Sequence, residues 1–107
     1  MLIVSHIRPD GDAVGAMLGL GRALVEAGKQ VNLALADGVP QALRYLPGSE
    51  RIERALPVEN LAQFDLLIVV DCSYMQRTGG VLDERLPDIN IDHHVTNDRF
   101  GTVNIVE

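Results

Sequence analysis

Histidine and aspartate side chains gather in three clusters along the sequence, and together they could hold divalent metal ions. The clusters are His6 with Asp10 and Asp12, then Asp71 alone, and finally the run Asp92-His93-His94. Sets that mix imidazole and carboxylate ligands suit Mn²⁺, with Mg²⁺ or Co²⁺ as substitutes. The single cysteine, Cys72, cannot supply the thiolate set of a structural zinc site. The residue types therefore predict a metal site, if the fold brings the clusters together.

Each cluster also has a purely structural interpretation. The run Pro-Asp-Gly-Asp is an ordinary turn sequence, in which Asp12 could be only a helix N-cap. His6 could be a partly buried residue at the end of a strand, and Asp71 could be a turn residue. The run Asp92-His93-His94 could be a solvated loop. The metal interpretation is favoured because such clusters recur at equivalent positions, each after a predicted strand.

The apolar pattern predicts an α/β fold, an open parallel sheet with flanking helices. Buried parallel strands are typically continuous apolar runs, such as Leu66-Leu67-Ile68-Val69-Val70. Strands are predicted at residues 2–5, 30–36, 52–56, 64–71, 87–91 and 102–106. Helices are predicted at residues 13–28, 40–45 and 59–63, with a loop and one helical turn at 72–80. Within the first helix, Gly15, Gly19 and Gly21 indicate close packing on the sheet or the approach of a ligand.

In an open parallel sheet, ligands bind beyond the carboxyl ends of the strands. All three clusters follow predicted strands, so we expect them to converge on one site at that edge. The amides at the start of the first helix could add an anion-binding contribution. Asp71 follows the most apolar strand and is the predicted bridge between two metal ions. Two such ions would activate a water for phosphoryl transfer.

Length, charge and cysteine content limit the class of protein. The 107 residues suit one domain, and no apolar run approaches the length of a membrane span. No signal peptide is visible, and one cysteine excludes an internal disulfide, so we expect a cytoplasmic chain. With 9 basic against 15 acidic residues, the net charge of −6 argues against a broad basic nucleic-acid groove.

Four further residues carry open interpretations. Arg8 and Arg77 could hold phosphate or be surface charges. Asn97 could contact substrate or cap a loop. Cys72 is expected to be a small buried residue rather than a nucleophile, because no activating partner adjoins it.

The order and strand context of the three clusters resemble the first three motifs of the DHH phosphoesterases. Two longer patterns most resemble the oligoribonuclease/PAP phosphatase branch of that family. They are Pro9-Asp10-Gly11-Asp12-Ala13-x-Gly15 and Asn90-Ile91-Asp92-His93-His94-x-x-Asn97-x-x-Phe100-Gly101. The resemblance covers nearly the whole chain.

The resemblance implies a metal-binding role for five residues of the clusters. His6 and Asp10 would hold one Mn²⁺, Asp12 and His93 the other, and Asp71 would bridge the two ions.

The remaining two residues of the clusters would not be ligands. Asp92 would orient a neighbouring group, and His94 would face the scissile phosphate or its leaving oxygen. The implied reaction is Mn²⁺-dependent hydrolysis of short oligoribonucleotides or of 3′-phosphoadenosine 5′-phosphate. Arg77 and Asn97 are the candidate substrate contacts.

Other functions stay open at this point. Within the family, the chain could be an inorganic pyrophosphatase or a cyclic-dinucleotide phosphodiesterase. Outside catalysis, it could be a metal- or nucleotide-binding fragment. A receiver-like domain phosphorylated on Asp71 would not explain His6, His93 or His94.

The resemblance also implies family features that residues 1–107 do not contain. Relatives carry a fourth motif with a further metal-binding aspartate, and Asp98 lies too close to His94 to be it. Many have a C-terminal substrate domain, and position 74, often acidic in relatives, is Tyr74 here. We therefore expect residues 1–107 to be a partial DHH catalytic domain. Its partners would be a short RNA or nucleotide and the missing substrate domain, and a homodimer is compatible with the resemblance.

Overall fold

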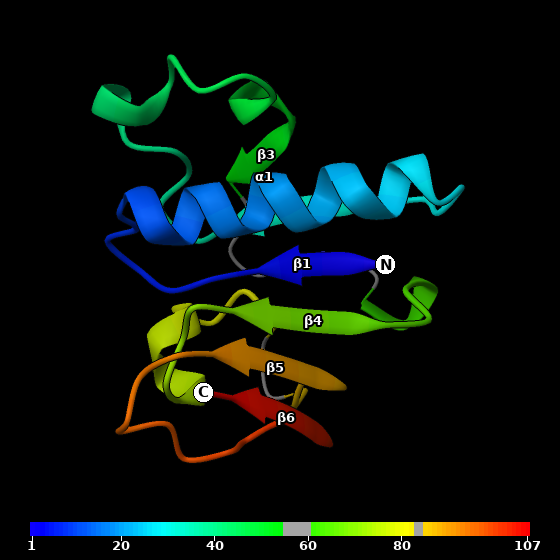
Figure 1. Ribbon diagram of the computed structural model, residues 1–107, viewed down its shortest axis with the longest axis vertical. Helices are drawn as coiled ribbons and strands as arrows, with labels where there is room; N and C mark the ends of the chain where they lie inside the picture. Colours follow the sequence, from blue (N-terminus) through cyan, green and yellow to red (C-terminus); the bar gives the residue numbers. More distant parts are fainter. Residues whose placement is uncertain (55–60, 83–84) are drawn as a thin grey trace.

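Six parallel strands form one open sheet in the computed structural model, which describes residues 1–54, 61–82 and 85–107 (Figure 1). The strand order is β3-β2-β1-β4-β5-β6. The strands are β1 Leu2–Val4, β2 Asn32–Leu35, β3 Ile52–Arg54, β4 Leu67–Val70, β5 Ile89–Asp92 and β6 Val103–Val106. The prediction of an open parallel sheet is confirmed, with strands shorter than the apolar runs. The end of the strand predicted at 52–56, and the start of the helix predicted at 59–63, lie outside the described residues.

One α-helix, α1, spans Gly11–Glu26 and begins two residues earlier than the pattern predicts. Its N-cap is Asp10, so the N-cap interpretation of Asp12 is wrong. The expected close packing of the glycines holds only for Gly21, where an added Cβ would lie 3.2 Å from Leu33 Cδ2. An added Cβ on Gly15 or Gly19 would meet nothing within 4 Å.

Short 3₁₀ helices lie in the three other segments predicted to be helical, and a further one, at residues 49–51, lies where no helix was predicted. They are η1 Gln41–Leu43, η2 Ser49–Arg51, η3 Leu61–Gln63 and η4 Met75–Thr78. The last of these confirms the helical turn predicted between residues 72 and 80. Among the residues that the structure describes, every helix is too short or too polar to span a lipid bilayer.

The two faces of the sheet carry two separate apolar cores. In Figure 1, α1 lies over the β1–β2 half of one face, where Val14 and Met17 pack on Ile3, Leu33 and Ile68. The opposite core includes four fully buried strand residues and the segment that follows β4. Its buried members include Leu2, Val4, Leu67, Val69, Cys72, Val81 and Leu82. The two cores hold β1 and β4 firmly from both sides.

The chain reverses its direction of winding between β1 and β4. From β1 it crosses through α1 to β2, whereas from β4 it proceeds to β5 and β6 on the other side. The two central strands are paired in register, with Val4 beside Val69. The hydroxyl of Ser5 donates a 2.7 Å hydrogen bond to the carbonyl of Val70, which joins the two strand ends. Such a reversal point is where open α/β sheets bind their ligands.

Candidate metal centre

The first group of potential ligands surrounds His6, which lies just beyond β1 and is only 7% exposed. Its Nδ1 lies 2.6 Å from the carbonyl oxygen of Ile7. Because a carbonyl oxygen only accepts hydrogen bonds, Nδ1 carries a proton, and in the neutral form of the ring Nε2 presents a lone pair. This atom faces Asp10 Oδ1 at 3.8 Å and Asp71 Oδ2 at 3.6 Å. We call His6, Asp10 and Asp71 the His6 group.

The start of α1 positions Asp10 within this group. Its Oδ1 accepts a 3.0 Å hydrogen bond from the backbone N–H of Ala13. That bond is the main reason why the pKa of the Asp10 carboxyl lies below its usual value; partial burial opposes the effect and His6 supports it. Asp10 is therefore an ionised carboxylate at neutral pH, and the first turn of the helix holds it in place.

Asp71 occupies the centre of the site, immediately after β4. It is 6% exposed, and its backbone N–H donates to the carbonyl of Ile91 at 2.9 Å. Its backbone is left-handed, with φ of 54°, a conformation that is uncommon outside glycine and concentrates at functional sites. This turn directs the two carboxylate oxygens to different histidines. Oδ2 faces His6, and Oδ1 lies 2.7 Å from Nε2 of His93.

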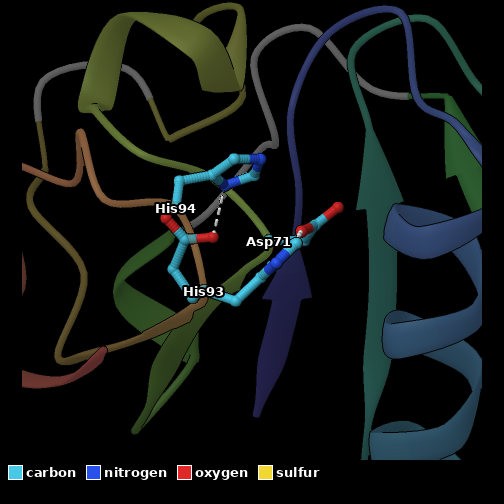
Figure 2. Close-up of side chains that lie close together, drawn as sticks. Asp71, His93 and His94 are labelled. Atoms are coloured by element: carbon cyan, nitrogen blue, oxygen red, sulfur yellow. Dashed lines mark hydrogen bonds and ion pairs between the residues drawn. The ribbon is translucent and has the colours of Figure 1, made fainter. Parts of the chain in front are cut away.

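The second group of potential ligands follows β5. We call Asp71, Asp92, His93 and His94 the His93 group; one ligand atom from each lies within 4.8 Å of the others. Figure 2 shows His93 pointing toward Asp71. The rings of His93 and His94 lie close together, with their centroids 4.5 Å apart. The hydrogen bond to Asp71, and then the charge of that carboxylate, raise the pKa of His93. The side chain of His93 is 61% exposed.

A buried carboxylate orients His94. Nδ1 of His94 lies 2.6 Å from Oδ1 of Asp92, whose side chain is fully buried. Burial alone would raise the pKa of Asp92, but hydrogen bonds from Asn97 and from the backbone N–H groups of His93 and His94 together lower it. An ionised carboxylate only accepts, so Nδ1 of His94 carries a proton. The ring thus lines a cavity of about 220 Å³ together with His6, Asp10, Asp71, Tyr74 and Arg77.

The structure does not draw every predicted residue into the two groups. Asp12, in the first turn of α1, belongs to neither; it lies on an apolar groove of about 500 Å³ that also reaches Asp71 and His93. Arg8 is exposed, has φ of 50°, and its N–H donates to Asp37. Of the two arginines considered, Arg77 is the one that lines the cavity beside His94.

Two asparagines, Asn90 and Asn97, connect the loops that carry the site. Asn90 is fully buried, and its Nδ2 donates to the carbonyls of Val69 and Cys72 at 3.3 and 3.1 Å. The sequence patterns give Asn90 no role of its own. Two signals mark it: Asn90 opens one of the patterns that resemble the DHH family, and it is a lone amide between Ile89 and Ile91 in a predicted strand.

Cys72 confirms the expectation of a buried, unreactive residue. It is 1% exposed, and burial raises the pKa of its thiol to about 12. Its backbone carbonyl takes more part in the site than its sulfur, because it accepts from both Asn90 and Asn97.

The donor set fits divalent cations of the kind expected. In the neutral form of His6, the lone pair of Nε2 faces two carboxylate oxygens at distances too long for hydrogen bonds. Electron-rich atoms so arranged repel one another unless a cation lies between them. In the His93 group, Asp71 contributes its other oxygen and His93 an exposed imidazole. Imidazole and carboxylate atoms are ligands that suit Mn²⁺.

The fold and the site define a class of protein, the open α/β domains whose polar side chains gather at the carboxyl ends of the parallel strands. More specifically, residues 1–107 match the DHH family, N-terminal domain, and the chain belongs to that family. Two relatives share a name, bifunctional oligoribonuclease and PAP phosphatase NrnA. The chain is 45% identical to the Thermus thermophilus protein over 105 residues, covering 98% of this chain and 31% of that protein. It is 29% identical to the Bacillus subtilis protein over 106 residues, covering 94% and 31%.

A solved structure has the same fold. The exopolyphosphatase-related protein from Bacteroides fragilis superposes with a TM-score of 0.80 at 30% sequence identity. The match covers 99% of this chain and 34% of that one. The chain therefore spans about a third of the length of these relatives. The resemblance drawn from the three clusters is confirmed at the level of the family.

Proposed function

We propose that this chain forms the catalytic centre of a phosphoesterase that uses two Mn²⁺ ions to hydrolyse short oligoribonucleotides or 3′-phosphoadenosine 5′-phosphate. The observation that carries the proposal is the position of Asp71, with Oδ2 facing His6 at 3.6 Å and Oδ1 facing His93 at 2.7 Å. One carboxylate between two imidazoles is the arrangement that a shared ligand of two ions requires. The names of the relatives support this choice of substrates.

The proposed ligands divide between the two ions. His6 and Asp10 would hold the first ion, His93 and Asp12 the second, and Asp71 both. Asp12 is exposed in the first turn of α1, and its charge contributes to raising the pKa of His93. Bound divalent ions supply a nucleophile at neutral pH and offset the charge on phosphate.

Residues of the cavity would act on the substrate directly. Asp92 fixes the proton of His94 on Nδ1, which leaves Nε2 as the atom that meets a ligand. In the imidazolium form, Nε2 donates a proton to the leaving oxygen. The guanidinium of Arg77 lines the same cavity and offsets the charge of the phosphate. Arg77 is thus a local positive charge in a chain of net charge −6.

The proposal includes partners and a location. Substrate contacts beyond the phosphate would come from a further substrate domain, and the greater length of the relatives supports this. A homodimer is compatible with the same proposal. The free and buried thiol of Cys72 supports a place in the reducing cytoplasm.

Turnover with a panel of phosphate substrates tests the proposal. The panel comprises 3′-phosphoadenosine 5′-phosphate, a diribonucleotide, pyrophosphate and a cyclic dinucleotide, each with Mn²⁺ and with chelator. We expect Mn²⁺-dependent release of product from the first two, and loss of nearly all of it in Asp71→Asn. The matched control is Asp98→Asn, an exposed carboxylate outside both groups, which should leave turnover unchanged.

Three results would contradict the proposal, the first two in its metal chemistry and the third in its substrates. Turnover that survives the chelator would show that the reaction does not need the metal. If Mn²⁺ binding and turnover are the same in Asp71→Asn as in Asp98→Asn, Asp71 is not a ligand shared by the two ions. Turnover of pyrophosphate or of the cyclic dinucleotide alone would keep the metal chemistry and change the substrate.

A further inference from the structure

Asn97 lies in the loop after β5, and both polar atoms of its side-chain amide already make hydrogen bonds within the protein. Its Nδ2 lies 2.7 Å from Asn90 Oδ1, 2.8 Å from Asp92 Oδ2 and 3.2 Å from the carbonyl oxygen of Cys72. Its Oδ1 accepts a 2.6 Å hydrogen bond from the N–H of Arg99. An amide group has two N–H bonds, so three acceptors already share them. Little capacity remains for a substrate.

We propose that Asn97 is a positioning residue, which holds the imidazole of His94 by holding Asp92. Asn97 and His94 bind different oxygens of the same buried carboxylate, Oδ2 and Oδ1. Two donors on opposite oxygens fix the plane of the carboxylate. That plane in turn fixes the direction of Nδ1–H, and with it the direction of Nε2 toward the cavity.

The same amide also holds the loop that carries Asp71. The carbonyl of Cys72 accepts from Asn97 and from Asn90, at 3.2 and 3.1 Å. This carbonyl comes directly after the left-handed residue Asp71. Asn97 therefore connects the loop after β4 with the loop after β5, and it couples the place of Asp71 to that of His94.

The arrangement explains why an amide is needed at this position. An aspartate has nearly the same shape as asparagine, but it has no N–H to offer. The substitution Asn97→Asp would put a second carboxylate against Asp92 in a buried place, where two negative charges repel strongly. Alanine would leave Oδ2 of Asp92 without this donor, and a buried charged group without its hydrogen bond is costly.

This inference rests on the proposed function only for the task of His94, and its test needs neither metal nor turnover. In protein labelled with ¹⁵N-histidine, we expect His94 in the Nδ1–H form with a slowly exchanging ring N–H. His6 should show the same form, because of its bond to Ile7. Asn97→Ala and Asn97→Asp should accelerate exchange of the His94 ring N–H by about tenfold or more, the effect of losing a hydrogen bond to a charged group.

The His6 signal and a neighbouring variant serve as controls. Thr96→Ala alters an exposed residue of the same loop and should change neither histidine. Unchanged exchange at His94 in Asn97→Ala, with the His6 signal retained, would overturn the inference.

If the Asn97 variants lose the His6 signal as well, the inference is tested on the unaltered protein instead. The side-chain amide protons of Asn97 must then be protected from exchange relative to those of Gln41, which is exposed. If the two amides exchange at the same rate, Asn97 holds nothing and the inference is wrong.

Discussion

The two ligand groups share Asp71 but are built in different ways. In the His6 group, hydrogen bonds with the backbone hold the side chains of His6 and Asp10 in place. His6 uses Nδ1 on the carbonyl of Ile7, and the carboxylate of Asp10 is held by the first turn of α1. In the His93 group, Nε2 of His93 is bonded to Asp71 itself, and its side chain is 61% exposed.

This difference predicts an order of metal loading. A ligand already held in place loses little conformational freedom when it binds, and its lone pair is free. The His6 group meets that description. In the His93 group, an ion must first replace the proton between His93 and Asp71, because a metal ligand has to be deprotonated. The first ion should therefore enter at the His6 group and the second at the His93 group.

The largest expected effect is that of His6→Ala. Removal of this imidazole takes away a ligand of the tighter ion, so Mn²⁺ affinity should fall by more than about 100-fold, beyond the loss usual for an outer partner. Isothermal titration calorimetry measures both affinity and stoichiometry. Tight binding of one equivalent in His6→Ala would place the first ion elsewhere and reverse the comparison.

His93→Ala should have a smaller effect on the first ion. We expect one equivalent of Mn²⁺ to remain, with an affinity close to that of the unaltered chain, while the second equivalent disappears. The matched control is Thr96→Ala, which should retain both. Equal losses in His93→Ala and in His6→Ala would show that the two groups fill together, and would remove the proposed order.

The pH dependence of binding separates the groups further. Asp71 raises the pKa of His93, so this imidazole holds its proton to a higher pH than the ordinary value of about 6.5. Below that raised pKa, displacing one proton should make affinity rise about tenfold per pH unit. The second equivalent should therefore strengthen as pH rises, and His93→Ala should flatten the dependence. Calorimetry between about pH 6 and 8 measures both slopes, and parallel slopes would contradict the assignment.

The strands, and the convergence of the polar residues that follow them, could be predicted because both depend on the local pattern of apolar residues. A parallel strand buried on both faces needs a continuous apolar run, as at Leu67–Val70, where all four residues are buried. The polar residues that follow such strands must share one edge of the sheet. Asp71, placed after the most apolar strand, is thus found between both histidines.

Two choices that the sequence leaves open are visible only in the folded chain. Asp10 and Asp12 both fit the local pattern of an N-cap, and the choice of Asp10 becomes visible only in the turn that the structure shows. The sequence leaves Asn97 open as a substrate contact or a loop cap. Its amide binds the carbonyl of Cys72, 25 positions away, and no local pattern contains that information.

The glycines of α1 pose the same kind of choice, and they supply the smallest expected effect. Gly15 is exposed, and an added Cβ would meet nothing within 4 Å. Alanine in an exposed helix interior is more stable than glycine by about 0.5–1 kcal/mol, so Gly15→Ala should raise the thermal unfolding midpoint by a few degrees. In Gly21→Ala, by contrast, the new Cβ would press on Leu33 at 3.2 Å, and the gain should be smaller or reversed. Circular dichroism of both variants measures this difference.

Gly15→Ala also tests whether the His6 group is formed before metal binds. Gly15 lies in the helix whose first turn holds Asp10, so the substitution stabilises the element that positions one ligand. If Asp10 is already capped in the metal-free chain, a more stable helix adds nothing to the binding step, and Mn²⁺ affinity should be unchanged. A higher affinity in Gly15→Ala would mean that binding itself completes the start of α1. The His6 group would then be no better preformed than the His93 group, and the predicted order of loading would lose its physical basis.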